Sequence, residues 1–103
     1  MFDFVVWWCG NSGGRTAAVA AKPPNARGLY DVLGNVREWT WDRFAETLAD
    51  ATDPLGAVTG DYRVARGGSF ADPAWGNRLA FRSGYLPSGA DPGTGFRLVR
   101  RAP

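Results

Sequence analysis

Histidine is absent from this sequence, and cysteine, lysine and methionine occur once each. The lack of histidine removes the commonest transition-metal ligand and general base. The single cysteine, Cys9, cannot form an internal disulfide. No apolar run approaches the roughly 20 residues of a membrane span, and no basic segment precedes the apolar residues at the N-terminus. We therefore expect a soluble protein with no visible signal peptide, and its compartment stays unassigned.

Charge is nearly balanced, with 12 basic and 10 acidic residues and a net charge of +2. This balance argues against a nucleic-acid surface over the whole chain, so no nucleic-acid partner is expected. Almost all the basic residues are arginine, which favours planar carboxylate pairs and aromatic stacking. The 103 residues allow at most one domain, and 14 glycines, 7 prolines and 5 tryptophans indicate many turns with large rings held between loops.

Short stretches of alternating, β-prone residues are separated by glycine-rich and proline-rich turns. This pattern predicts strands over 36–41, 62–66, 78–82 and 95–100. A short strand over 17–21 and a helical turn near 46–49 are weaker predictions. The apolar segment 1–8 is compatible with either a buried strand or the end of a helix.

Acidic, glycine and aromatic residues are concentrated in the segment 28–42. Gly34 and Asn35 predict a turn leading into the 36–41 strand, on which Glu38 is flanked by bulky residues. A carboxylate in such a place needs a backbone donor, a distant arginine or a cation. Because the turn can bring Asp31 and free carbonyls towards Glu38, an oxygen-ligated calcium ion is one reading of the segment. A capped turn with a solvated glutamate explains the same residues.

Four ordered blocks together resemble the formylglycine-generating enzyme family, the sulfatase-modifying-factor domains that also occur in ergothioneine-type sulfoxide synthases. The blocks are Pro24-Asn25-Ala26-x-Gly28-Leu29-Tyr30-Asp31-x-x-Gly34-Asn35-Val36-x-Glu38-Trp39, Arg63-Val64-x-Arg66-Gly67-Gly68-Ser69-Phe70, Arg78-x-Ala80-x-Arg82 and Gly95-Phe96-Arg97-Leu98-Val99-Arg100. The resemblance begins near Trp8 and covers only the C-terminal half of a family domain. We therefore expect residues 1–103 to be the C-terminal part of such a domain.

The resemblance implies an α+β, irregular C-type-lectin-like fold with short antiparallel strands and extensive loops, incomplete relative to a whole family domain. It also implies a structural calcium ion as cofactor. In the family, the positions that match Asp31 and Glu38 supply side-chain oxygens, and those that match Gly34 and Val36 supply backbone carbonyls. Oxygen ligands of this kind suit a hard cation.

The family's catalytic chemistry fits this sequence less well. True formylglycine generators are copper-dependent oxidases that use a cysteine pair between the Gly-Gly-Ser block and the arginine-rich strand. The matching segment here, 70–78, has no cysteine, and Cys9 lies in another block, where we expect a small buried thiol. Soft thiolates hold Cu(I), so no copper site is evident. The sulfoxide synthases place iron on histidines, which this sequence lacks. Whether the parent protein is an enzyme is left open.

Three functions remain. The favoured one is a non-catalytic, calcium-stabilised domain or half-domain whose loops bind an unknown ligand or protein partner. The alternatives are a C-terminal fragment of a metal-dependent oxidising enzyme and a retroelement-diversified C-type-lectin-like binding protein. The residues expected to contact a ligand or partner are Trp75, Asn77, Arg78, Arg82 and Tyr85.

Several arginines have a second interpretation. Arg66, Arg78, Arg82 and Arg97 are candidates for an anionic pocket, but ties to loop acids such as Asp42 or Asp72 are the favoured explanation. Oligomeric state is not indicated.

Overall fold

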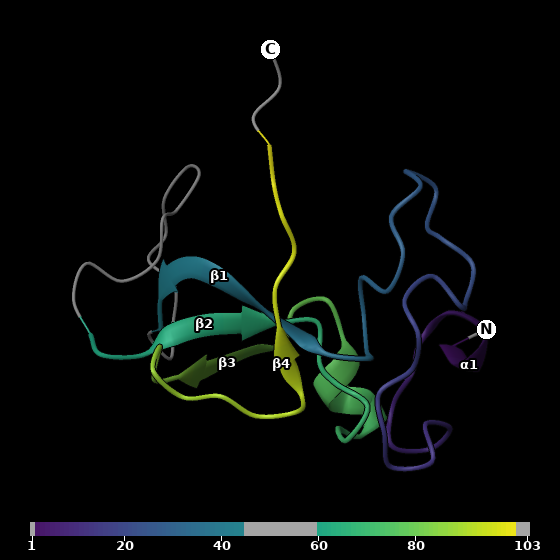
Figure 1. The fold of residues 1–103 in the computed structure, drawn as a ribbon, viewed down its shortest axis with the longest axis horizontal. Coiled ribbons are helices and arrows are strands. Elements are labelled where there is room, and N and C mark those ends of the chain that lie inside the picture. The colour runs from purple at the N-terminus through teal and green to yellow at the C-terminus, as the bar shows by residue number, and fades with distance from the viewer. Residues whose placement is uncertain (1, 45–59, 101–103) are drawn as a thin grey trace.

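A computed structural model describes residues 2–44 and 60–100. The predicted helical turn near 46–49 lies outside these residues. The elements are short and are joined by long loops (Figure 1). In chain order they are α1 (Phe2–Val5), β1 (Arg37–Arg43), β2 (Arg63–Arg66), the 3-10 helix η1 (Ala74–Asn77), β3 (Arg82–Tyr85) and β4 (Thr94–Gly95).

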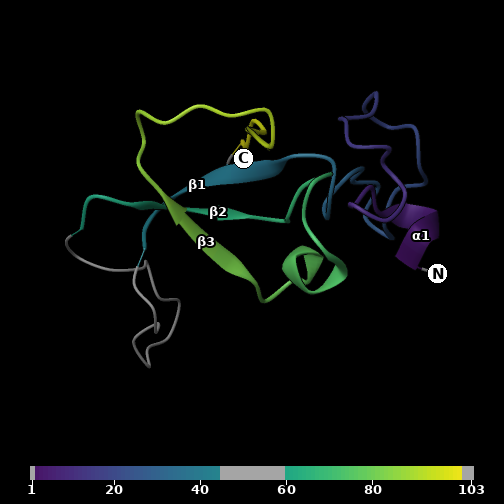
Figure 2. The same ribbon diagram turned by 90° about the horizontal axis from the view of Figure 1, so that it is seen from below.

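One mixed sheet in the order β3-β2-β1-β4 forms one side of the molecule. The β1/β2 and β2/β3 pairings are antiparallel, as expected, and place Trp39 opposite Ala65 and Ala65 opposite Ser83. The edge strand β4 instead runs parallel to β1, with Glu38 opposite Gly95. Figures 1 and 2 show α1 and the N-terminal loops on the other side of the molecule from this sheet.

Two of the predicted strands are present and the others differ. The 36–41 and 62–66 predictions correspond to β1 and β2. The 78–82 strand prediction was wrong, because residues 78–81 follow η1 as a turn and β3 begins only at Arg82. The alternation of arginine with apolar residues did not correspond to two faces here, because residues 78, 79 and 80 are all exposed. Residues 17–21 form no strand. In the N-terminal segment, residues 2–5 form the helix α1, and Trp7 forms an isolated parallel bridge with Gly34.

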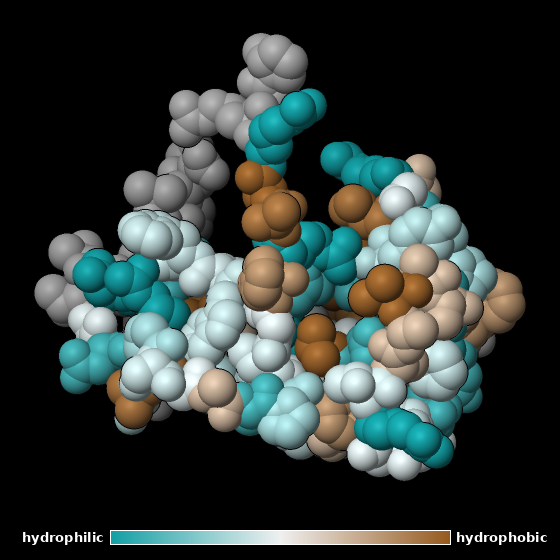
Figure 3. All heavy atoms as spheres, viewed as in Figure 1, coloured by the Kyte–Doolittle hydropathy of each residue, from teal (hydrophilic) through white to brown (hydrophobic). Residues whose placement is uncertain are grey.

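The predicted C-terminal strand is shorter than its sequence pattern. Only Thr94 and Gly95 pair with β1, and residues 96–100 continue beyond the sheet with no strand partner among the described residues. Their apolar side chains are exposed, and hydrophobic spheres follow this rising segment in Figure 3. Residues 96–100 therefore have the sequence pattern of a strand but no neighbouring strand, within the described residues, to which they could hydrogen-bond.

The apolar core is small. Within the described residues the buried hydrophobic side chains are Val6, Val64 and Ala65, while Asn35, Ser69 and Asn77 are buried polar residues. The fold is α+β, and polar side chains bonded to loop backbone replace much of an apolar core. No helix in the described ranges is long and apolar enough to cross a membrane.

The Gly34-Asn35 turn joins the sheet to the N-terminal loops. Both residues have positive φ, +80° and +63°. The Gly34 N–H donates to the Gly67 carbonyl at 2.6 Å, and the Asn35 N–H donates to the Trp7 carbonyl at 2.9 Å. The Asn35 side chain bonds both backbone groups of Ala17, at 2.9 and 3.1 Å. The predicted turn is therefore present, and it connects four segments.

Gly34→Ala should destabilise the domain strongly. A Cβ at this position would meet the Trp7 carbonyl oxygen, and the backbone is left-handed. We expect a loss of about 2–4 kcal/mol in the free energy of unfolding, measured by urea denaturation. Gly13 shares a positive φ, but a Cβ added there would have no neighbour within 4 Å, so Gly13→Ala is the matched control. Equal losses for the two variants would show that close packing on Trp7 is unimportant.

Candidate functional site

Glu38 forms an ion pair with Arg97. Glu38 lies opposite Gly95 in the parallel β1/β4 pair, and Arg97 follows Gly95 by two residues. The Arg97 Nε atom lies 2.7 Å from Glu38 Oε1, and Nη2 lies 3.1 Å from Oε2. This two-point contact is the strong geometry for guanidinium and carboxylate. Of the three partners expected for Glu38, the structure contains the distant arginine.

The Arg97 guanidinium also contacts main-chain oxygens of the preceding loop. Its Nη2 atom donates to the carbonyls of Tyr30 and Asp31, at 2.7 and 3.2 Å. The hydrogen bond with Glu38 raises the pKa of Arg97, partial burial opposes the rise, and the charges of Glu38 and Asp31 add to it. Oxygens from two distant segments therefore gather around one positive charge.

The four residues expected at a calcium site have different surroundings, and only Asp31 and Glu38 contact Arg97. The Asp31 carboxylate accepts the Ala20 N–H at 2.9 Å, while the Asp31 carbonyl faces Arg97. Gly34 is buried against Trp7, and the side chain of Val36 packs beside Gly95. No cluster of three or more histidine, cysteine, aspartate or glutamate residues occurs in the described ranges.

The donor set at this contact has the chemistry that calcium needs, since it consists of carboxylate and carbonyl oxygens. However, Arg97 occupies both oxygens of Glu38. A calcium ion can therefore use Glu38 only if the guanidinium moves away. The calcium ligands stay a prediction.

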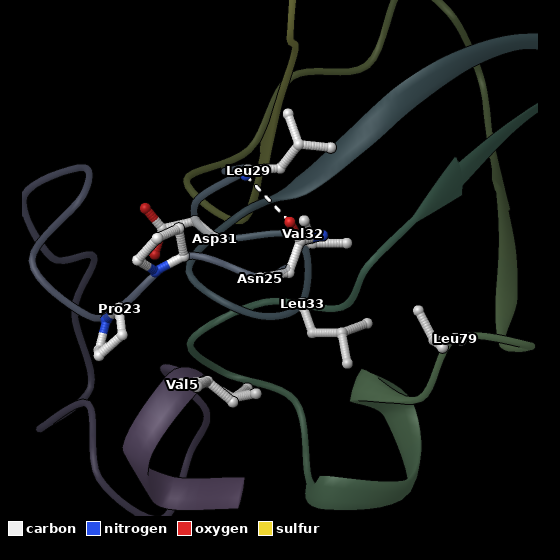
Figure 4. A pocket seen from close by; sticks show the side chains of 10 residues that line it. Val5, Pro23, Asn25, Leu29, Asp31, Val32, Leu33 and Leu79 are labelled. Carbon is white, nitrogen blue, oxygen red and sulfur yellow. Dashed lines mark hydrogen bonds between the residues drawn. The ribbon is translucent and has the colours of Figure 1, made fainter. Parts of the chain in front are cut away.

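A mainly apolar pocket of about 260 Å³ opens beside the loop that precedes β1. Figure 4 shows Val5, Leu33 and Leu79 on its walls, with Asp31 at the same loop. The Asn25 side chain accepts the Leu29 N–H at 3.0 Å and thereby shapes the loop that borders the pocket. The pocket brings α1, the loop before β1 and the turn after η1 together.

Two of the predicted contact residues, Trp75 and Arg78, lie on the surface at η1 and the turn after it. Trp75 is 63% exposed and meets Phe81 edge to face at 5.5 Å between ring centroids. Arg78 is exposed and lies over the Phe81 ring. The three side chains form one aromatic and cationic cluster, and its use as a contact surface stays a prediction.

The side chains of the other three predicted contact residues pack against other parts of the fold. Asn77 is fully buried, so its expected surface position was wrong; its amide donates to the carbonyls of Ser69, Asp72 and Pro73. Tyr85 belongs to β3 rather than to a loop, and its ring meets Trp39 edge to face. Arg82 is half-buried beside the Phe44 ring. Local sequence could not show these contacts because their partners are distant in the chain.

Sequence reasoning overlooked Arg37. Its guanidinium is 11% exposed and pairs with Asp72 at 3.1 Å and with Asp91 at 3.4 Å. It also donates to Ser69 Oγ at 3.1 Å and lies over the Tyr85 ring. Asp72 was expected to pair with an arginine, but the partner is Arg37 rather than one of the four arginines considered. The excess of arginine over lysine was the available signal.

The environment of Cys9 also differs from the expectation. The residue is exposed rather than buried, and its thiol is free. Its backbone N–H donates to the Asp72 carbonyl at 3.0 Å. Cys9 thus helps to hold the 70–73 loop through its backbone, while its side chain faces outward.

Asn77→Ala should unfold the domain more easily, because three loop carbonyls lose their donor in a buried place. We expect a loss of about 1–3 kcal/mol in the free energy of unfolding, measured by urea denaturation. The neighbouring exposed substitution Arg78→Gln should change it by less than about 0.5 kcal/mol. If Asn77→Ala is equally mild, the amide does not hold the loop.

Comparison with known proteins identifies the family of this chain. The model of the sulfatase-modifying factor enzyme 1-like domain matches residues 5–102. The formylglycine-generating enzyme of Thermomonospora curvata is 42% identical over 93 residues, which are 82% of this chain and 31% of that enzyme. The inactive C-alpha-formylglycine-generating enzyme 2 of Mus musculus is 39% identical over 88 residues, 81% of this chain and 25% of that protein.

Among solved structures, Treponema denticola variable protein 1 superposes with a TM-score of 0.84 and 37% identity, covering 92% of this chain and 35% of that one. The chain therefore spans about a third or less of the length of these curated relatives. The extended match and the shared fold lead to one conclusion: this chain belongs to the family of sulfatase-modifying factor enzyme 1-like domains.

Proposed function

We propose that this chain is a non-catalytic domain of the formylglycine-generating enzyme type that binds a ligand or partner through its loops. The segment 70–78 carries the proposal. In the oxidases, the resemblance places a copper-holding cysteine pair there, whereas here the segment has no cysteine. Its interior is held by the Asn77 amide, which donates to three carbonyls. A carboxamide cannot replace thiolates toward Cu(I).

The non-catalytic nature of this chain has a direct test. The chain should not convert the target cysteine of a sulfatase-derived peptide to formylglycine in the presence of Cu(I) and oxygen, because its lone thiol is exposed on another loop. Mass spectrometry of the peptide measures the conversion, and a complete formylglycine-generating enzyme is the positive control. Conversion by this chain above the level of its Cys9→Ser variant would contradict the proposal.

Calcium stabilisation is the second part of the proposal. The support is the gathering of the Glu38 carboxylate and the Asp31 carbonyl around one positive charge, together with the oxygen-only composition of the set. Asp31, Gly34, Val36 and Glu38 would hold the ion, and its charge would take over the role of Arg97 at Glu38. The ion would join the loop before β1 to the sheet.

Calcium should therefore raise the unfolding free energy, by about 2.7 kcal/mol at a concentration 100 times the dissociation constant. Glu38→Gln should remove the effect because the neutral amide is a poorer calcium ligand. Arg97→Gln should increase the effect, since it removes the competing guanidinium. Thermal unfolding with calcium and with a chelator measures all three proteins.

A matched control is available for this experiment. Asp61→Asn removes an exposed acid outside the site and should leave the calcium effect unchanged. If calcium changes unfolding in neither the wild type nor Arg97→Gln, the calcium proposal fails. The non-catalytic assignment would be unaffected by that result.

The Trp75 cluster supports the binding part of the proposal. Trp75 and Arg78 are exposed and rigidified by contact with Phe81, and tryptophan and arginine are enriched where proteins bind partners. The likeness to Treponema denticola variable protein 1 favours a second candidate, a diversified binding protein. Genomic copies of this sequence that differ mainly at the exposed positions 75 and 78 would favour that candidate, whereas scattered differences would oppose it.

A further inference from the structure

A second pocket lies on the sheet. Its volume is about 330 Å³, and its walls are formed by Trp39, Thr40, Trp41, Arg63 and Pro87. This volume is at the lower end of the range for small-molecule sites. The residues come from β1, β2 and the loop after β3, so two adjacent strands supply most of the wall.

Trp41 gives this pocket an exposed aromatic surface, and Arg63 gives it a positive charge. Trp41 is 86% exposed although it belongs to a central strand. The Arg63 guanidinium lies over the Trp41 ring, 5.0 Å from its centroid, and also donates to the Trp41 carbonyl. These contacts hold the arginine against one ring face, and the high exposure of Trp41 leaves much of the indole available.

The floor of the pocket is fixed more firmly. Trp39 meets Tyr85 edge to face, with 6.2 Å between the ring centroids. The Thr40 hydroxyl donates to the Val64 carbonyl at 3.0 Å. A fixed floor reduces the ordering cost of binding.

Charge complementarity indicates the ligand. Within the described ranges Arg63 forms no salt bridge, in contrast to Arg37 and Arg97. Its guanidinium keeps donors beyond the one that bonds Trp41, and these suit a carboxylate in two-point contact. The indole and Pro87 supply apolar surface for a ring.

We propose that this pocket binds a small carboxylic acid whose ring lies against Trp41 while its carboxylate contacts Arg63. The ring can belong to an aromatic acid or to an acidic sugar. The inference rests on β1 and β2 and does not depend on calcium or on the absence of oxidase activity.

Indole N–H signals in NMR spectra of the whole chain test the proposal. Benzoate and galacturonate represent the two sources, benzyl alcohol and galactose are the neutral rings, and acetate lacks a ring. At least one acid should shift the Trp41 signal and bind about tenfold more tightly than its neutral counterpart, as expected for one charge-assisted hydrogen bond. Shifts with benzoate alone indicate an aromatic acid, and shifts with galacturonate alone indicate a sugar.

Three variants complete the experiment. Arg63→Gln should weaken binding about tenfold, as followed by the Trp41 signal. Trp41→Ala should weaken binding by a similar factor, and because this variant lacks the Trp41 signal, its binding is followed by the indole N–H of Trp39, which also lines the pocket. Trp75→Ala removes another exposed tryptophan at η1 and should leave binding unchanged. Unfolding curves check that each variant is folded. The proposal is overturned if neither acid shifts the Trp41 signal, if acids and neutral rings bind equally, or if Arg63→Gln, folded, binds as the wild type does.

Discussion

The structure depends on one backbone turn, at Gly34 and Asn35. Its hydrogen bonds reach Trp7, Ala17 and the segment 67–70, which are three separate parts of the chain. Because both residues adopt left-handed backbone, the turn can reverse the chain at the point where β1 begins. The direction of β1, and with it the position of Glu38, Trp39 and Trp41, follows from this turn. A domain with so few buried apolar residues needs such polar connections.

Arginine side chains also connect distant segments of the chain, and their surroundings differ from site to site. Arg37 is largely buried among acids and hydroxyls, whereas Arg97 joins Glu38 to loop carbonyls nearer the surface. The Arg37 side chain is 11% exposed, against 37% for Arg97, so solvent screens the Arg37 contacts less. Arg97 has a different importance, because it takes the place at Glu38 that a calcium ion would need. In the part of the chain that the structure describes, Arg63 lies over the Trp41 ring and forms no salt bridge, and this distinguishes the pocket on the sheet.

The resemblance in four ordered blocks predicted the family and the α+β class, and local sequence pattern predicted the turn and two of the strands. These features depend on short-range chemistry: left-handed residues at 34–35, and alternating β-prone residues in β1 and β2. The family blocks carry the same information in a fixed order. Candidate site residues were less predictable. Trp75 and Arg78 are exposed as expected, but Asn77, only one residue away, is fully buried. Neighbours in sequence differ in this way because a 3-10 helix turns successive side chains in different directions.

The sequence by itself determined which chemistry is available: oxygen ligands without histidine, one thiol, and many arginines. Tertiary structure decided how these groups are paired. In the folded chain Glu38 pairs with Arg97, Asp72 pairs with Arg37, and the Asn77 amide donates to three loop carbonyls. Each of these partnerships except the last joins residues more than 30 positions apart. Residue type limits what a group can bind, but only the folded chain brings a particular donor within hydrogen-bonding distance of a particular acceptor.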